Sequence, residues 1–322
     1  MSIKSIDSLM RYLRDKKGID ISGSAQKRKL QNLGYYHAYK GYRFFRVSSK
    51  VLPYTDFDQL VSVYNFDMKL KALFYPQLMF IETALKNRAL QEILNNSKSE
   101  RFNDIFHQTL NDYKSYPITD SRYNEELKKR LNLRTKIYSD LARNFNKKQM
   151  VRHFYEKDMP VPIWAIFEQI SLGEFAEFIH CLNLSTRSNF SRSVGLHQSY
   201  DSDGRLIEKF TYLFRDLRNA VAHNEPIFDI RFSRGKIDTR LTNYLMSITN
   251  ISSINFTTIA DYVILVSYFL KSLGISKTEN RRFISDFVNL YETLKKEVPT
   301  SIYSIIIHTD TRTKINNLLK FL

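Results

Sequence analysis

The sequence predicts a mostly α-helical protein, and three observations lead to that prediction. Hydrophobic residues make up 43% of the 322 residues, which is enough to bury a sizeable core. Glycine and proline are scarce, with 9 and 7 residues, which disfavours a turn-rich β-sandwich. Apolar side chains recur at helical spacing along most of the chain. We expect a helical bundle core, a basic helical N-terminal portion and additional C-terminal helices.

The N-terminal portion, residues 1–50, is expected to form two short helices. The first ends at Gly18, and the second runs from near Ser24 to Gly34. This segment carries 12 Lys and Arg against 3 Asp and Glu, a net charge of +9 out of +16 for the chain. Such an excess favours contact with phosphates of a nucleic acid, and it is also compatible with a solvated basic arm.

The next part of the chain is expected to contain long helices. Asp56 and Asp58 are candidate N-caps for an extended helical pattern, and Pro76 is expected to kink or split it. Residues 96–120 are polar and mixed, which indicates loop with a short helix. Residues 121–146 predict a charged helix.

The region that follows combines an apolar stripe with proline and glycine residues at expected helix ends and contacts. Pro162 suits a first helical turn, and Gly173 predicts a close contact between helices. A second amphipathic helix is expected over 205–223, ended by Pro226, and residues 227–241 are compatible with a short hairpin. A buried stripe is expected from Trp164, Phe167, Ile170, Phe175 and Phe178.

The C-terminal part is also predicted to be helical. Ser276 and Glu279 form a predicted capping box at the start of its second helix. We therefore divide the chain into a basic segment 1–50, a helical core 51–240 and a C-terminal extension 241–322. The C-terminal helices are expected over 257–273, 277–297 and 310–322.

Composition also bounds the location and the chemistry. Cys181 is the only cysteine, so no intrachain disulfide forms, and a reducing cytoplasm fits. The longest apolar run, 262–270, is much shorter than the roughly 20 residues of a membrane span, so we expect a buried helix and no membrane partner. The histidines are scattered without ligand spacing and no phosphate-binding glycine loop is present, so neither a metal nor a cofactor is expected.

The stretch FRDLRNAVAHNEP, residues 214–226, is the main candidate site. The bare spacing of Arg and His has little weight, because it occurs three times. Only Arg218 and His223 lie on a strongly apolar helical stretch, with Asn219 as an added amide donor and small alanines around them. The other two pairs are Arg101 with His107 and Arg192 with His197.

These residue types suit phosphodiester transfer on RNA. Arg218 can hold a phosphate and stabilise transition-state charge, while His223 can exchange a proton with the 2′-hydroxyl or the departing 5′-oxygen. The alternative is an Arg and a His that cap a helix C-terminus, where positive charge is favourable. Five residues of an ideal helix turn about 500°, so the two side chains diverge by about 140°. A site shared between the subunits of a homodimer would bring them together.

Three blocks upstream, together with this helix, resemble the Abi-like (abortive infection) proteins of the AbiD/AbiF type. The blocks are LQNLGYYHAYKGYRFF, LVSVYNFDMKLKALFYPQLMFIETALKNR and HFYEKDMPVPIWAIFEQISLGEFAEFI, and the helix LRNAVAHNEPIF follows them in order. The helix is similar to the signature helix of HEPN-type ribonucleases, which also supply the nuclease sites of RNA-guided type VI CRISPR effectors. The resemblance covers roughly residues 25–232.

The resemblance implies an α-helical HEPN core and toxin-like RNA cleavage in anti-phage defence. In some relatives a structured small RNA binds and restrains the protein. By position, Arg218, Asn219 and His223 match the catalytic motif of a metal-independent endoribonuclease that forms 2′,3′-cyclic phosphates. Many relatives carry a second His or a basic residue after the motif His, where this chain has Asn224.

An aromatic and basic block between residues 35 and 46 is a candidate RNA-binding segment. Its rings can stack on bases and its cations can contact phosphates; alternatively most rings are core and only the cations face solvent. The rings are Tyr35, Tyr36, Tyr39, Tyr42, Phe44 and Phe45. The candidate RNA-binding cations are Lys40, Arg43 and Arg46, with Lys27, Arg28 and Lys29 from the preceding helix.

Three functions thus remain open at the level of the sequence. The first is a dimeric, metal-independent endoribonuclease that acts as a defence toxin. The second is a non-catalytic RNA-binding scaffold with the same fold. The third is a DNA-binding regulator that uses the basic N-terminal helices.

Overall fold

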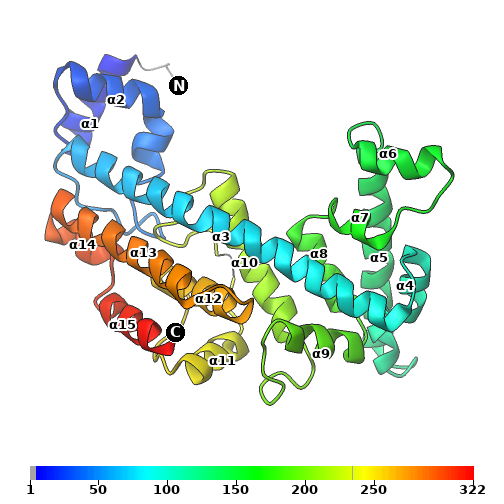
Figure 1. The fold of residues 1–322 in the computed structure, drawn as a ribbon. Coiled ribbons are helices and arrows are strands. Elements are labelled where there is room, and N and C mark those ends of the chain that lie inside the picture. Colours follow the sequence, from blue (N-terminus) through cyan, green and yellow to red (C-terminus); the bar gives the residue numbers. More distant parts are fainter. Residues whose placement is uncertain (1–4, 234) are drawn as a thin grey trace. The chain divides into compact units, whose positions relative to one another are not determined.

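The structure is a computed structural model that describes residues 5–233 and 235–322 (Figure 1). In this described part the chain forms α-helices and short helical turns, and no strand is present, only three isolated β-bridges. The expectation of a mostly α-helical protein is therefore confirmed. The chain groups into two compact units that are interleaved in sequence, so each unit is described by itself.

The first unit contains the chain up to Gln77, Leu217–Ile237 and Leu245–Leu322. It holds the first half of α3 (Phe57–Ser97), the end of α10 (Leu206–Ala222) and the second part of α11 (Thr239–Thr249). The helices that lie wholly within it are α1 (Ile6–Lys17), α2 (Gly23–Tyr35), the π-helical turn Tyr36–Lys40, α12 (Ile259–Ser272), α13 (Lys277–Glu297), α14 (Thr300–Ile306) and α15 (Thr311–Phe321).

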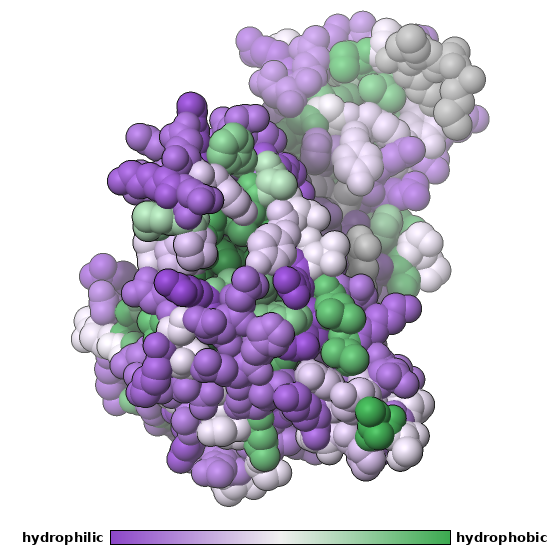
Figure 2. Space-filling model, turned by 90° about the vertical axis from the view of Figure 1, so that its right-hand side faces the viewer, coloured by the Kyte–Doolittle hydropathy of each residue, from purple (hydrophilic) through white to green (hydrophobic). Residues whose placement is uncertain are grey.

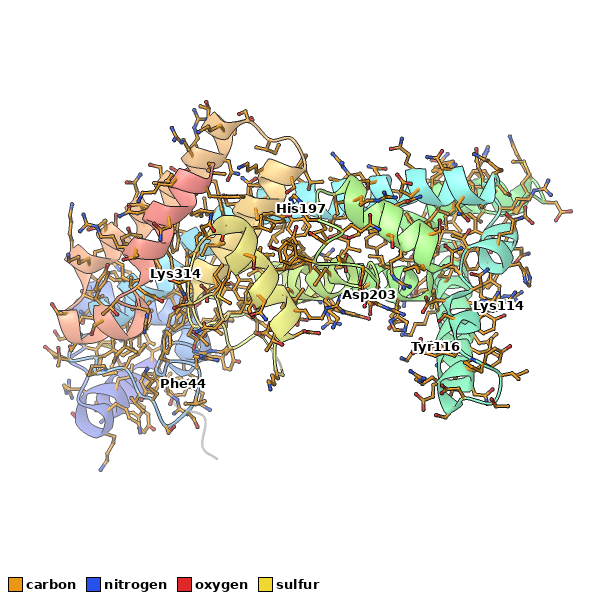
Figure 3. All side chains as sticks on the ribbon, turned by 90° about the horizontal axis from the view of Figure 1, so that it is seen from below. Phe44, Lys114, Tyr116, His197, Asp203 and Lys314 are labelled. Atoms are coloured by element: carbon orange, nitrogen blue, oxygen red, sulfur yellow. The ribbon has the colours of Figure 1, made fainter. Side chains whose placement is uncertain are left out.

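Helix α12 lies in the core of the first unit. Its residues from Ile259 to Leu270 are all buried, and it packs against α13 and α15. Its one buried acid, Asp261, forms a 2.8 Å ion pair with Lys314 of α15, which Figure 3 labels. The buried helix expected at 262–270 is thus confirmed. Within the described residues, no helix is both long and apolar enough to cross a membrane.

The predicted helix ends of the first unit are largely confirmed. Gly18 ends α1 in the left-handed conformation, and Gly34, with a φ of 68°, interrupts the helical backbone at the end of α2. Ser276 and Glu279 form the expected capping box at the start of α13. Local sequence signals were sufficient here because each involves neighbouring residues only.

The hairpin expected over residues 227–241 is wrong. No strand forms there among the described residues, and α11 begins at Thr239. The carboxylate of Asp229 instead accepts hydrogen bonds from the Arg231 side chain and from the Arg46 backbone N–H, at 2.8 to 2.9 Å. These side-chain bonds hold the segment as irregular chain. Arg234, at the predicted turn, lies outside the described residues.

Helix α3 is one continuous helix, which Figure 1 shows, so the expected split at Pro76 is wrong. Proline removes one backbone donor from the helix, but Phe74 and Leu78 beside it are buried, and this packing supports the helix on both sides of Pro76. The division between the two units falls at Gln77 and Leu78, directly after this proline.

The second unit contains Leu78–Asp216 and Asp238–Tyr244. Its helices include the second half of α3 and the first part of α10. The others are α4 (Phe102–Gln108), a 3-10 turn (Asp112–Ser115), α5 (Ser121–Asn144), α6 (Gln149–Glu156), α7 (Ile163–Phe167), α8 (Leu172–Cys181) and α9 (Leu184–Ser193). These bounds confirm the short helix expected in 96–120 and the charged helix expected in 121–146.

The apolar stripe of the second unit differs from the prediction at one residue. Phe167, Ile170, Phe175 and Phe178 are buried as expected, but Trp164 is 39% exposed. The stripe belongs to two helices, because α7 ends at Phe167 and Ser171 starts α8 with its own capping box. The close contact expected at Gly173 is confirmed, since a Cβ there would lie 3.2 Å from Arg215 Cδ of α10.

A histidine bridges two carboxylates in the interior of the second unit. His180 Nδ1 lies 2.8 Å from Glu208 Oε1, and its Nε2 lies 2.5 Å from Glu126 Oε2. Burial by itself lowers the pKa of His180, but the hydrogen bond and charge of Glu208, helped by Glu126, outweigh both burial and the nearby Arg205 and raise it. The imidazolium form therefore ties α5, α8 and α10 together.

This arrangement makes the stability of the second unit depend on pH. A raised pKa in the folded state means that the contribution of His180 is complete below its unfolded pKa, about 6.5, and is lost as the pH rises through the folded value. We expect His180→Gln to lower the free energy of unfolding by about 1–3 kcal/mol at pH 6 and by less at pH 9. Urea unfolding at both pH values measures this. An equal effect at the two values would contradict it.

Candidate active site at the end of helix α10

The RNxxxH motif lies at the C-terminal end of α10, within the first unit. Arg218 and Asn219 are in its last turns, and His223 is the first residue after Ala222, where the helix ends. The His223 N–H still donates to the Asn219 carbonyl at 2.9 Å. The motif is therefore a helix end, and its positive charge faces the negative end of the helix dipole.

Asn224 ends the helix through its backbone conformation. It adopts a φ of 56°, in the left-handed region that asparagine tolerates better than most residues. The Asn224 N–H donates to Val221 O at 3.3 Å, and the Glu225 N–H donates to Ala220 O at 2.9 Å. This pair of bonds is a Schellman motif, which satisfies carbonyls that the helix end leaves open. It fixes the backbone that carries His223.

The three motif side chains are presented differently. Arg218 is half-buried, and its Nη1 donates to Asn219 Oδ1 at 3.2 Å, so the amide helps orient the guanidinium. His223 is exposed. Within residues 5–233 and 235–322, no hydrogen bond or ion pair involves the His223 ring, including any with Arg218. Within a single chain, Arg218 is thus hydrogen-bonded to Asn219, whereas the imidazole of His223 is accessible to a substrate or to a second protein molecule.

A buried acid on α3 anchors the chain that follows the motif. The side chain of Asp67 is fully buried, and its Oδ1 accepts the backbone N–H groups of Ile227 and Phe228 at 2.8 and 2.7 Å. Its Oδ2 accepts the Tyr42 hydroxyl at 2.8 Å. The segment after the motif is thereby held to the long helix by one carboxylate.

Lys71 extends this anchor to the motif itself. Its Nζ lies 2.8 Å from Asp67 Oδ2 and also donates to Asn224 Oδ1 at 2.8 Å. Asn224 thus serves as the helix-ending residue and as an acceptor for Lys71. Burial raises the pKa of the Asp67 carboxyl, and Lys71 and Tyr42 oppose that rise. The four donors around Asp67 are satisfied by its ionised form.

No pattern in the sequence indicated that Tyr42, Asp67 and Lys71 support the motif. Asp67 and Lys71 are four residues apart, and each directly follows a buried residue, Phe66 and Leu70 respectively. An opposite-charge pair at this spacing inside an apolar stretch of helix is a signal for a buried ion pair. Its connection to the motif depends on tertiary contacts across 153 residues, which spacing does not reveal.

The aromatic block supports this anchor through its buried rings. Tyr39, Tyr42 and Phe45 are buried, and Tyr42 stacks on Phe228 with ring centroids 5.6 Å apart. The interpretation that most of these rings are core thus holds for only half of the six, since Tyr35 and Phe44 are half-buried and Tyr36 is 64% exposed. Phe44, labelled in Figure 3, lies under the guanidinium of Arg231 at 4.3 Å.

The candidate RNA-binding cations fall into two groups. Lys27 and Lys29 form exposed ion pairs with Asp7 and Asp58, and the Lys29 hydrogen bond lowers the pKa of Asp58. Arg43 is half-buried near the rings of Tyr39 and Phe44. The cations that are exposed and have no acidic partner among the described residues are Arg28, Lys40 and Arg46. Contact of all six with RNA stays a prediction.

Comparison with known proteins gives one finding. The family model described as Abi-like protein matches residues 28–229, a range that contains the Asp67 anchor, all of α10 and the motif. Neither curated proteins nor solved structures gave a match. In the described part of the chain, no group of three or more His, Cys, Asp or Glu residues is arranged to hold a metal ion.

Proposed function

Because this chain belongs to the Abi-like protein family, we propose that it acts in abortive infection as a metal-independent endoribonuclease of the HEPN type, restrained by a structured small RNA. One observation carries the catalytic part of the proposal. Arg218, Asn219 and the exposed His223 share one helix end. The residue that ends this helix, Asn224, is hydrogen-bonded to Lys71, which pairs with the buried Asp67. Rigid support of this kind is what a catalytic group needs.

The chemistry uses the two charged residues in separate roles. Arg218 holds the scissile phosphate through guanidinium N–H groups and stabilises the added negative charge of the transition state. His223 accepts the proton of the 2′-hydroxyl as that oxygen attacks phosphorus, and the bond from phosphorus to the 5′-oxygen breaks as that oxygen takes a proton from water. The products are a 2′,3′-cyclic phosphate and a 5′-hydroxyl. DNA lacks the attacking hydroxyl, so the same site leaves DNA intact.

We further propose that the site is completed by a second copy of the chain. Arg218 and Asn219 are joined within one chain, whereas no hydrogen bond or ion pair ties the His223 ring to any described residue. A two-fold symmetric dimer places the same helix end of both chains face to face, since such an interface uses the same surface twice. His223 of one chain then faces the phosphate held by Arg218 of the other.

Cleavage of RNA in excess EDTA tests the catalytic proposal. We expect the protein to cut unstructured RNA to 2′,3′-cyclic phosphate ends, and Arg218→Ala or His223→Ala to slow cleavage by about 10²–10⁴-fold. Arg192→Ala and His197→Ala are matched controls, because they share the spacing but lie outside the anchored helix end, and they should cleave normally. Equal cleavage by all proteins, or cleavage by none, would refute the assignment.

The exposed, unpaired cations Arg28, Lys40 and Arg46 favour a second candidate function, a non-catalytic RNA-binding scaffold. In that case RNA would copurify with the protein and with both motif variants, and none of them would cleave it. The same purified proteins therefore distinguish the two functions.

A further inference from the structure

The second unit carries a concentration of positive charge that is separate from the N-terminal segment. Residues 121–157 contain 11 Lys and Arg against 4 Asp and Glu, a net charge of +7. Outside this segment and residues 1–50, the chain holds 26 residues of each sign and is neutral. The whole excess of positive charge thus resides in two segments, and the second one forms α5, α6 and the chain around them.

Exposed aromatic rings accompany these cations. Tyr138 of α5, Tyr155 of α6 and Trp164 of α7 are 39%, 42% and 39% exposed. Each is braced by the edge of a less exposed phenylalanine, with centroids 5.8 to 5.9 Å apart. The three braces are Phe102, Phe145 and Phe154, at interplanar angles of 69°, 75° and 73°. These edge-to-face contacts hold the three exposed rings in fixed orientations.

The rings border hollows that adjoin one another. Tyr138 and Tyr155 line a cavity of about 460 Å³, and Trp164 lines one of about 340 Å³. Both cavities include Arg101 and Pro160 in their walls. A third hollow, of about 440 Å³, is lined by Phe145, which braces Tyr155, and by the cations of the α5–α6 connection. Figure 2, which faces α4, α5 and α6, shows hydrophilic side chains over most of this side, with hydrophobic ones in separate patches among them.

Cations without acidic partners stand beside the rings. Arg101, Lys147 and Lys148 are exposed, and in the described part of the chain no carboxylate lies within ion-pair distance of them. Arg134 lies 5.8 Å from the ring of Tyr138. Among the nearby acids, Glu156 pairs with Arg152 and Asp104 accepts from Ser99 at 2.6 Å, while Glu100 is exposed in the wall of the Trp164 cavity. Positive charge is therefore available on this surface.

We propose that this aromatic–basic surface, made of Arg101, Tyr138, Lys147, Lys148, Tyr155 and Trp164, binds single-stranded RNA. Bases stack on the braced rings while the cations neutralise the phosphates between them, which is how proteins hold single strands without reading their sequence. Resting on the proposed ribonuclease function, the surface is a docking site for the RNA substrate. All six residues belong to the second unit, whereas the motif belongs to the first.

The single tryptophan makes the proposal directly measurable. Trp164 is the only tryptophan in the chain, so its fluorescence reports on this surface alone. We expect a short oligouridylate to quench this fluorescence when titrated into the His223→Ala protein, which binds RNA without cutting it. Because stacking does not read the 2′-hydroxyl, the DNA strand of equal length should compete comparably. No quenching, or a preference for DNA, would overturn the proposal.

Variants with matched controls complete the test by fluorescence anisotropy of labelled RNA. Trp164→Ala and Tyr155→Ala should each weaken binding about tenfold, whereas Trp164→Phe should retain most of it. The control ring is Tyr200, which is 49% exposed and equally braced, by Tyr244 at 5.9 Å, so Tyr200→Ala should bind normally. A peptide-binding surface would show no RNA binding in any of these proteins, which overturns the proposal.

A variant that removes charge instead of rings tests the proposal even if the ring variants fail to fold. Replacing Lys147 and Lys148 with Ala should weaken binding and reduce the slope of log affinity against log salt by about 1.4. The same change at Lys295 and Lys296, an exposed lysine pair of α13, should alter neither. Unchanged binding in the Lys147 and Lys148 variant would overturn the proposal even if RNA cleavage is intact. RNA binding through this surface by a protein that cuts no RNA would refute only the proposed function.

Discussion

Replacing Asp67 with asparagine is expected to lower the free energy of unfolding by about 3–5 kcal/mol. The change keeps the size of the side chain and an oxygen for the Ile227 and Phe228 N–H groups, but it removes the charge that pairs with Lys71. Lys71 is only 5% exposed, so its ammonium would remain buried without a counter-charge. Breaking one side of a buried pair costs far more than the intact pair contributes.

Urea or thermal unfolding measures this effect, and Asp58→Asn is the matched control. Asp58 is an aspartate of the same helix that can be changed in the same way. Its ion pair with Lys29 is about half exposed, so the free energy of unfolding should fall by only about 0–1 kcal/mol. Adding Lys71→Met to Asp67→Asn removes the stranded charge and should recover part of the stability. An Asp67→Asn protein within 1 kcal/mol of wild type would show that the anchor is not needed.

The helices could be predicted because their signals are local. The apolar period, the glycine after α1 and the Ser276–Glu279 capping box each involve residues within one or two turns of one another. Pro76 misled the prediction because its cost is also local, whereas the burial of Phe74 and Leu78 that outweighs it is tertiary. The hairpin failed for a similar reason, since Asp229 is engaged by Arg46, which is far away in sequence.

Trp164 shows where periodicity stops being informative. It lies at the start of an apolar run, and a continuous helix through Phe178 would have buried it with the rest of the stripe. The break between Phe167 and Ser171 redirects the chain, so the run belongs to two helices with different buried faces. The capping signal of Ser171 and Glu174 was present in the sequence, and applying it would have separated the two helices.

The candidate site was predictable in part. Residue types and helical context selected Arg218, Asn219 and His223, and the structure adds the support beneath them. That support connects Tyr42, Asp67 and, through Lys71, Asn224, which are distant in sequence, so no local pattern indicates that they are hydrogen-bonded to one another. The positive charge of residues 121–157, by contrast, can be counted from the sequence. It is hidden when the net charge is summed over all 272 residues after residue 50, because the rest of that stretch is neutral.

Mixing two inactive variants is expected to restore about a quarter of the wild-type cleavage activity. In the proposed shared site, one chain supplies Arg218 and its partner supplies His223. Random exchange between Arg218→Ala and His223→Ala dimers makes half of them mixed, and each mixed dimer holds one site with both residues intact and one with neither. One site in four is then complete, against a loss of about 10²-fold or more in each variant alone.

The result separates a shared site from one built within a single chain. If both residues acted from the same chain, no mixed dimer would contain a complete site, and the mixture would be as inactive as its components. Mixing Arg218→Ala with a chain that carries both substitutions is the control, because this combination restores no site under either arrangement. Restoration should also require time for subunits to exchange and should fade on dilution as dimers dissociate. A monomer by light scattering that cleaves at the full rate would refute the shared site, since Arg218 and His223 would then have to act from one helix end.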